Sequence, residues 1–174
     1  MNRHFFTLKP LAALALALAL ILSLAACGGK QGDASGSSEP VDLTAFYETL
    51  TQNENAPALM PLEEAELMDA LYPGLSEIET SQRIVATAAI TSVAAELALV
   101  EVANAEDVPA VEAIFQARID YQVGDDANPG GAWYPETIEN WKQNARIVSN
   151  GSCVMLAVWE NADDVAEQFN ALFA

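Results

Sequence analysis

Histidine is almost absent from this chain of 174 residues, and cysteine occurs only twice. The single histidine, His4, lies in an N-terminal segment that we expect to be removed from the mature protein. Without histidine the chain cannot assemble a Ser-His-Asp triad, a Cys-His dyad or a histidine-ligated zinc site. We therefore predict that the protein needs no cofactor and is not an enzyme.

Basic residues are also scarce: seven lysines and arginines stand against 25 acidic residues, giving a formal net charge of −18. Removal of residues 1–26 takes away Arg3 and Lys9 but no acid, so the mature chain has a formal charge of −20. Such a surface repels nucleic acid and anionic lipid headgroups, which excludes nucleic acid as a partner. It favours either simple solubility or cationic partners such as metal ions and basic peptides.

The only long hydrophobic run, residues 11–24, is too short to span a bilayer comfortably and ends in Leu24-Ala25-Ala26-Cys27. These four residues match a lipobox, the processing site of bacterial lipoproteins. We predict that residues 1–26 are a signal peptide and that Cys27 carries diacylglycerol with palmitate-type chains. At about 0.8 kcal/mol per buried methylene, one acyl chain binds a membrane only marginally, and two chains on one cysteine make a lasting anchor. The predicted location is the outer face of the bacterial cytoplasmic membrane. An ordinary secretory signal with a chance cysteine is the disfavoured alternative.

After Cys27, residues 27–40 are rich in glycine and serine and contain no large apolar side chain. This composition predicts a flexible linker, and the remaining residues, 41–174, are long enough for one α+β domain with a single core. Once Cys27 is lipidated, Cys153 is the only thiol, so no intrachain disulfide is expected. Cys153 lies in an apolar strand without a histidine to activate it, which predicts a buried, inert thiol.

The hydrophobic spacing of the domain alternates between helical and strand-like periods. Helical spacing predicts helices at 43–50, from Pro61 to 71, at 108–122, from Pro135 to 141 and near 165–173. Strand-like spacing predicts two hairpins, one from strands 83–91 and 96–103 and one from strands 146–149 and 152–160. We expect the second hairpin to turn at Asn150-Gly151 with positive φ at both residues.

Two short sequence echoes link the hairpins: Arg-Ile-Val opens each one, and Asn-Ala-Glu/Asp-Asp-Val precedes the helix after each one. The pattern therefore predicts two strand-strand-helix units. Our predicted fold is α+β, with a four-stranded, mainly antiparallel sheet built from two ββα units, helices on one face, and an N-terminal pair of helices.

Several of these residues also resemble a family of small lipoproteins from Gram-positive gut anaerobes, known as a domain of unknown function. The resemblance covers about residues 71–174 and rests on Arg118, Gln122, Tyr134-Pro135-Glu136, Asn144-Ala145 and Asn150-Gly151. It implies a lipoprotein with an α+β fold, and it implies no catalytic residue.

Acidic residues offer two weak alternatives to a non-catalytic role. Asp125, Asp126 and Asn128 resemble the start of a calcium loop, but position 12 of that loop, counted from Asp126 as position 1, is Thr137 instead of the expected acid. An ordinary acidic loop is favoured, and a looser calcium site using Glu136 or Glu139 stays open. Paired carboxylates could instead serve a small hydrolase acting on envelope or dietary glycans. We interpret Glu96 and Glu101 as outward or strand-edge charges.

Four aromatic residues surround the glycine-rich segment 124–131, namely Tyr121, Trp133, Tyr134 and Trp141. Aromatic side chains on loops can bind sugar rings or anchor a protein partner, although they can also cover the end of a core. We predict that the protein is a membrane-anchored binding domain for a protein or cell-envelope ligand, with its binding surface at these residues. Participation in an envelope complex as an accessory subunit is a further possibility.

Overall fold

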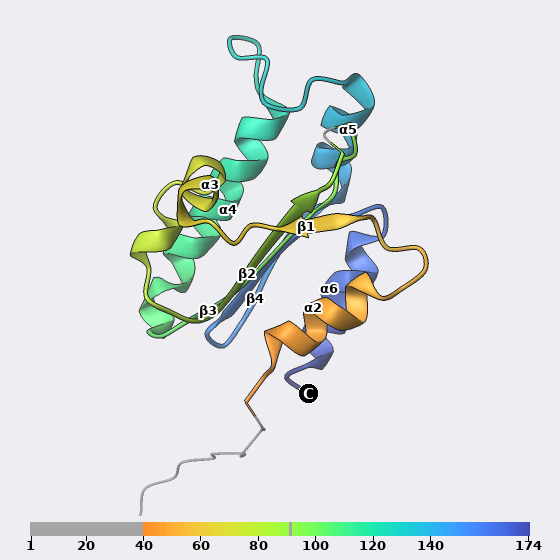
Figure 1. The fold of residues 1–174 in the computed structure, drawn as a ribbon. Coiled ribbons are helices and arrows are strands. Elements are labelled where there is room, and N and C mark those ends of the chain that lie inside the picture. The colour runs from red at the N-terminus through yellow and green to blue at the C-terminus, as the bar shows by residue number, and fades with distance from the viewer. Residues whose placement is uncertain (1–39, 91) are drawn as a thin grey trace, which may run out of the picture. The chain divides into compact units, whose positions relative to one another are not determined.

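The computed structural model describes residues 40–90 and 92–174. The predictions for the signal peptide (1–26), for Cys27 and for most of the linker concern residues outside this range. The described residues belong to one compact unit built around a sheet (Figure 1). None of their helices is both long enough and apolar enough to cross a membrane.

The centre of this unit is a five-stranded, entirely antiparallel sheet with the strand order β1-β2-β3-β5-β4. Its strands are β1 (Leu59–Pro61), β2 (Thr80–Ala88), β3 (Glu96–Val102), β4 (Ala145–Asn150) and β5 (Cys153–Val158). Both predicted hairpins form, and they join through the pairing of β3 with β5. The α+β class is confirmed.

The two central strands are buried on both faces of the sheet. All six residues of β5 are buried, and so are all residues of β3 except Glu101. Because successive side chains of a strand point to opposite faces, each strand contributes side chains to two cores. Ala98 and Val100 face one core, and Leu97 and Leu99 face the other. A strand with a continuous apolar run is typical of a sheet covered on both sides.

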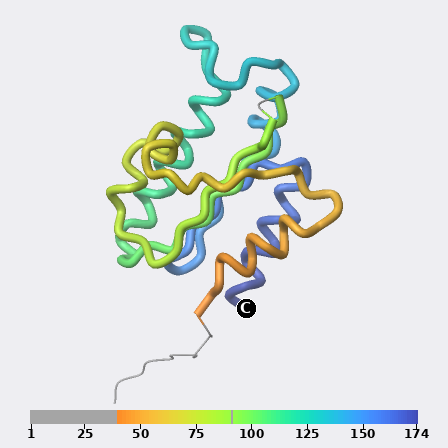
Figure 2. Tube along the Cα trace, in the orientation of Figure 1, coloured from red at the N-terminus to blue at the C-terminus, as the bar shows by residue number. Residues whose placement is uncertain are grey.

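Helices do cover both faces, so the predicted single layer of helices is wrong. One face, called the α4 face, is covered by α3 (Ala65–Leu71), α4 (Val108–Val123) and α5 (Pro135–Asn144). The other, called the α2/α6 face, is covered by α2 (Leu43–Thr51) and α6 (Ala162–Ala171). Figures 1 and 2 show the sheet between these two layers. Short 3₁₀ turns, Leu75–Glu77 and Ala105–Asp107, precede β2 and α4.

The predicted helix from Pro61 is partly wrong, because Leu59–Pro61 form edge strand β1 and α3 begins only at Ala65. Proline has no backbone N–H to donate, but an edge strand tolerates it where that group would not pair. Strand β1 adds the fifth strand that the sequence did not predict. It also separates α2 from α3, which therefore pack on opposite faces instead of forming a helical pair.

The two strand-strand-helix units also differ from the simple repeat that the sequence suggested. Helix α4 follows the first hairpin and packs on one face, whereas α6 follows the second and packs on the other. The shared Arg-Ile-Val segments are likewise inverted, with Ile84 in one core and Ile147 in the other. In the second hairpin only Gly151 has positive φ, so the turn lies at Gly151-Ser152 and not at Asn150-Gly151.

Candidate functional site

A buried ion pair lies at one end of the α4 face. Glu96, the first residue of β3, is 2% exposed, and Arg118 of α4 is 5% exposed. The arginine binds the carboxylate through two parallel hydrogen bonds, Nε to Oε1 at 2.8 Å and Nη2 to Oε2 at 2.8 Å. This bidentate geometry is the strongest form of such a pair. The interpretation of Glu96 as an outward or strand-edge charge is therefore wrong.

Tyr72, directly after α3, completes the buried network. Its hydroxyl donates a hydrogen bond to Oε1 of Glu96, and the side chain is fully buried. Burial first, and the adjacent carboxylate second, raise the pKa of Tyr72 well above its usual value, so the hydroxyl keeps its proton. Burial opposes the charge on Arg118, but the hydrogen bonds and charge of Glu96 outweigh it and raise the arginine's pKa.

Two aromatic rings flank the guanidinium group. The central carbon of that group lies 5.7 Å from the ring centre of Tyr72 and 5.5 Å from that of Trp141. Both distances are within the range of cation–π attraction. Aromatic faces thus replace part of the water that the buried charge has lost, and they fix the orientation of the guanidinium plane.

Strand and helix periodicity place these groups together. Glu96 lies two and four residues before Ala98 and Val100, so it shares their side of β3. Arg118 lies seven residues after Val111 and three after Phe115, so it continues the buried stripe of α4. The periodicity of the sequence therefore already placed Glu96 and Arg118 on buried stripes. Apolar core residues usually occupy such positions, so the two charged residues did not stand out as a site.

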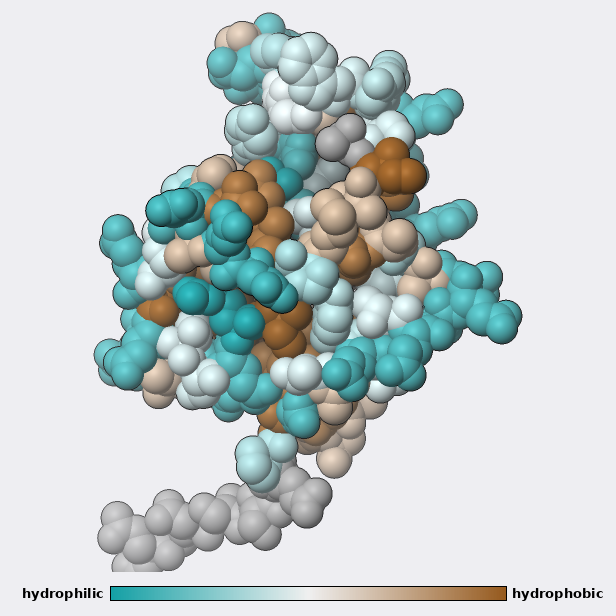
Figure 3. Space-filling model, in the orientation of Figure 1, coloured by the Kyte–Doolittle hydropathy of each residue, from teal (hydrophilic) through white to brown (hydrophobic). Residues whose placement is uncertain are grey.

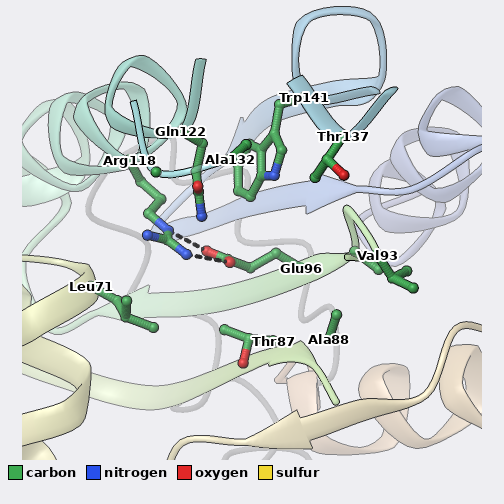
Figure 4. A pocket seen from close by; sticks show the side chains of 12 residues that line it. Leu71, Thr87, Ala88, Val93, Glu96, Arg118, Gln122, Ala132, Thr137 and Trp141 are labelled. Carbon is green, nitrogen blue, oxygen red and sulfur yellow. Dashed lines mark hydrogen bonds and ion pairs between the residues drawn. The ribbon is translucent and has the colours of Figure 1, made fainter. Parts of the chain in front are cut away.

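A cavity of about 230 Å³ opens beside the ion pair (Figure 4). Its polar lining comes from Thr87, Glu96, Arg118, Gln122 and Thr137, and its other lining residues are Leu71, Ala88, Val93, Ala95, Gly131, Ala132 and Trp141. Figure 4 shows the amide end of Gln122 directed toward the ion pair. The cavity therefore combines a hydrogen-bonding edge with small apolar walls.

The four predicted binding-surface residues separate into two groups. Trp133 is 89% exposed, Tyr121 63% and Tyr134 56%, whereas Trp141 is only 3% exposed. Trp141 is therefore wrong as a surface residue: it lies on the side of α5 that faces the sheet, one turn after buried Thr137. We call the three exposed rings the aromatic surface. Tyr121 and Trp133 lie next in sequence to cavity residues Gln122 and Ala132, and Tyr134 follows Trp133.

Backbone hydrogen bonds hold the aromatic surface against the end of α4. The N–H groups of Gly131 and Ala132 donate to the carbonyls of Tyr121 and Gln122, at 2.7 Å and 3.1 Å. Trp133 therefore follows two residues whose positions are fixed.

The acidic loop uses its first aspartate internally. Oδ1 of Asp125 accepts hydrogen bonds from the backbone N–H groups of Ala127 and Asn128, both at 2.7 Å, and from the Asn128 side chain. These backbone hydrogen bonds lower the pKa of Asp125. Among residues 40–90 and 92–174, no three His, Cys, Asp or Glu side chains are arranged to hold a metal ion. Asp125, Asp126 and Asn128 thus form a self-capped loop in the structure.

Cys153 lies at the start of β5, is 2% exposed and faces the α2/α6 core. Burial, with a smaller effect from the charge of Glu101, raises the pKa of the thiol to about 11. A thiol with so high a pKa is almost entirely protonated at neutral pH, so it is a poor nucleophile.

The chain matches no protein-family model, and neither a curated protein nor a solved structure gives a significant match. The resemblance to small lipoproteins of unknown function therefore stays a prediction.

Proposed function

We propose that this protein is a lipid-anchored, extracytoplasmic binding protein whose ligand contacts the aromatic surface of Tyr121, Trp133 and Tyr134. The exposure of Trp133 carries this proposal. Tryptophan is the side chain most enriched among residues that dominate binding energies, and one that is 89% exposed contributes little to the core. Because Trp133 follows a hydrogen-bonded segment, less conformational entropy is lost when it becomes ordered on binding.

The distribution of apolar residues supports a small contact centred on a few anchors. In the face drawn in Figure 3, apolar side chains form separate patches among polar ones. Large continuous apolar patches are the usual mark of extensive protein interfaces. A ligand that inserts against a few rings therefore suits this surface better than a broad hydrophobic docking partner.

The anchor itself can be tested with Cys27→Ser. Because the thiol forms the bond to the lipid, this variant should carry no diacylglycerol and should leave the membrane fraction. Metabolic labelling with a fatty acid and cell fractionation measure both effects. A lipid-labelled, membrane-bound variant would contradict the lipobox interpretation.

The binding surface can be tested by crosslinking the anchored protein on living cells and identifying what is captured. Trp133→Ala with Tyr134→Ala should lower capture strongly, because each true anchor contributes about 2 kcal/mol or more. Met60→Ala with Leu67→Ala is a matched control, since these apolar side chains are 52% and 51% exposed elsewhere. Equal capture by both double variants would refute the proposed surface.

A glycan hydrolase has less support. Glu96 is the only carboxylate that lines the cavity, and it is already bound by Arg118 and Tyr72. A glycosidase of the usual type needs a second carboxylate about 5–10 Å away, depending on its stereochemistry. An accessory role in an envelope complex fits the same surface, and co-purification of other subunits would distinguish it.

A further inference from the structure

The cavity beside the ion pair contains a buried donor without a protein partner. Trp141 is only 3% exposed, yet its indole N–H donates a hydrogen bond to no described residue. Among the described residues, Oδ1 of Asp69 is the only fully buried side-chain nitrogen or oxygen without a hydrogen-bond partner. The indole nitrogen of Trp141 is therefore not fully buried, and it opens onto the cavity that Trp141 lines. Buried indole N–H groups normally find an acceptor. The indole N–H of Trp141 is therefore available to a hydrogen-bond acceptor that enters the cavity.

Gln122 supplies a second free group at the same place. Its side chain is half-buried, lines the cavity and forms no hydrogen bond with any described residue. A primary amide offers both donors and an acceptor, so it can donate to the C=O or accept from the N–H of another amide. Gly131 makes room for it, because a Cβ there would lie 2.7 Å from Oε1 of Gln122 and 2.4 Å from the ring of Tyr121.

The charges at the cavity select an uncharged group. Glu96 and Arg118 oppose each other at 2.8 Å, so the nearest full charges largely cancel. An added anion or cation would lose its hydration without gaining an unpaired counter-charge. The strongly negative chain disfavours anions further.

The size of the cavity selects a small group with an apolar end. Its volume of about 230 Å³ lies below the roughly 300–1,000 Å³ of sites that enclose whole drug-sized ligands. Ala95 and Ala132 give it walls that fit a methyl group. The rest of a ligand must project outward, toward residues that adjoin the exposed rings of Tyr121 and Trp133.

We propose that the cavity binds the acetamido group of an N-acetylated sugar. The acetamido carbonyl accepts from the indole N–H of Trp141, its N–H, which points the opposite way in a trans amide, donates to the Gln122 carbonyl, and its methyl group lies among the alanines. The sugar ring then reaches the aromatic surface. This inference rests on the proposed function and gives its ligand a chemical class.

The test is a titration of the folded domain with N-acetylglucosamine, followed through the indole N–H signals in NMR spectra. The chain has three tryptophans, so Trp133→Ala and Trp159→Phe assign two signals and leave that of Trp141. N-acetylglucosamine in the millimolar range should shift the Trp141 signal saturably, while glucose and glucosamine should not. The titration itself is read on the unmodified protein, and the two variants serve only to assign its signals.

Variants then locate the contact. Trp141→Phe and Gln122→Ala should each weaken binding by roughly three- to tenfold, the effect of one lost hydrogen bond. Trp159→Phe and Gln143→Ala are matched controls that change the same residue types outside the cavity lining, and they should bind normally.

Absence of a Trp141 shift, an equal shift with glucose, or unchanged affinity in both cavity variants would overturn the inference. If capture on cells still depends on Trp133 and Tyr134 in that case, the proposed binding function survives and only the acetamido ligand is refuted. If N-acetylglucosamine binds normally but capture ignores those rings, the aromatic surface is refuted and the cavity site stands.

Discussion

The two faces of the sheet differ in the polar side chains that they bury. All three buried polar residues of the described chain, Glu96, Arg118 and Thr137, lie on the α4 face. The α2/α6 face has an apolar core in which Phe46 and Phe169 pack with ring centres 6.0 Å apart. One face carries a charged network beside a cavity, and the other carries ordinary packing.

This difference separates binding from stability. A buried ion pair often stabilises a protein no more than apolar residues of the same shape would, so its presence is weak evidence of a stabilising role. It does fix the directions of its donors and acceptors, and on the α4 face it fixes them beside a cavity. The α2/α6 face then supplies stability through burial of apolar area.

The largest expected effect is from breaking the ion pair. Arg118→Met should lower the free energy of unfolding by about 4 kcal/mol, because Glu96 is left buried without its counter-charge. The triple variant Tyr72→Phe, Glu96→Leu and Arg118→Met should recover most of that loss, since it leaves no polar group unpaired. Urea denaturation measures both. A cost below about 1 kcal/mol for the single change would show that Glu96 reaches solvent.

The corresponding change on the α2/α6 face is Met155→Ala. Met155 is fully buried, so the lost contacts and the new cavity should cost about 3 kcal/mol in the same denaturation experiment. A second substitution that removes a neighbouring side chain should not recover the lost free energy of unfolding, whereas at the ion pair such substitutions should. Recovery by a second apolar-to-alanine change nearby would contradict the packing interpretation.

Gln82→Ala tests the attachment of α2 to the sheet and should cost about 1–2 kcal/mol. Gln82 accepts from the backbone N–H of Leu43 at 3.0 Å and donates to Val41 at 2.7 Å and to Glu101 at 2.8 Å. Thermal unfolding measures the loss. Gln168→Ala, on the exposed side of α6, is the matched control, and a change below 0.5 kcal/mol is expected there.

The smallest effect at neutral pH is that of Cys153→Ala, but this effect should depend on pH. Burial raises the folded-state pKa of the thiol to about 11 from an ordinary value near 9. A raised pKa stabilises the fold below pH 9, and this contribution is lost as pH rises toward 11. The stability advantage of the wild type over Cys153→Ala should therefore shrink between pH 9 and pH 11. A constant difference in urea denaturation across that range would contradict the buried thiol.

Helical and strand-like periods in the sequence were sufficient to predict most elements of the domain. The cap at Asp42, whose side chain accepts from Ala45 at 2.9 Å, and the apolar run of β5 are local features. Their effect depends on neighbouring residues in the chain, so spacing reveals them. The exposed rings of Trp133 and Tyr134 belong to the same class, because the loop that precedes them can build no core.

Tertiary structure alone decided how these elements are arranged and where the site lies. The pairing of β3 with β5 buries both strands on both faces, which forces α4 and α6 to opposite sides of the sheet. The same pairing buries the first residue of β3, and α4 brings Arg118 to it from 22 residues away. A charged residue on an apolar stripe is compatible with either exposure or burial. Only the packing of a distant partner against it determines which, because the interaction that offsets its desolvation is not local in sequence.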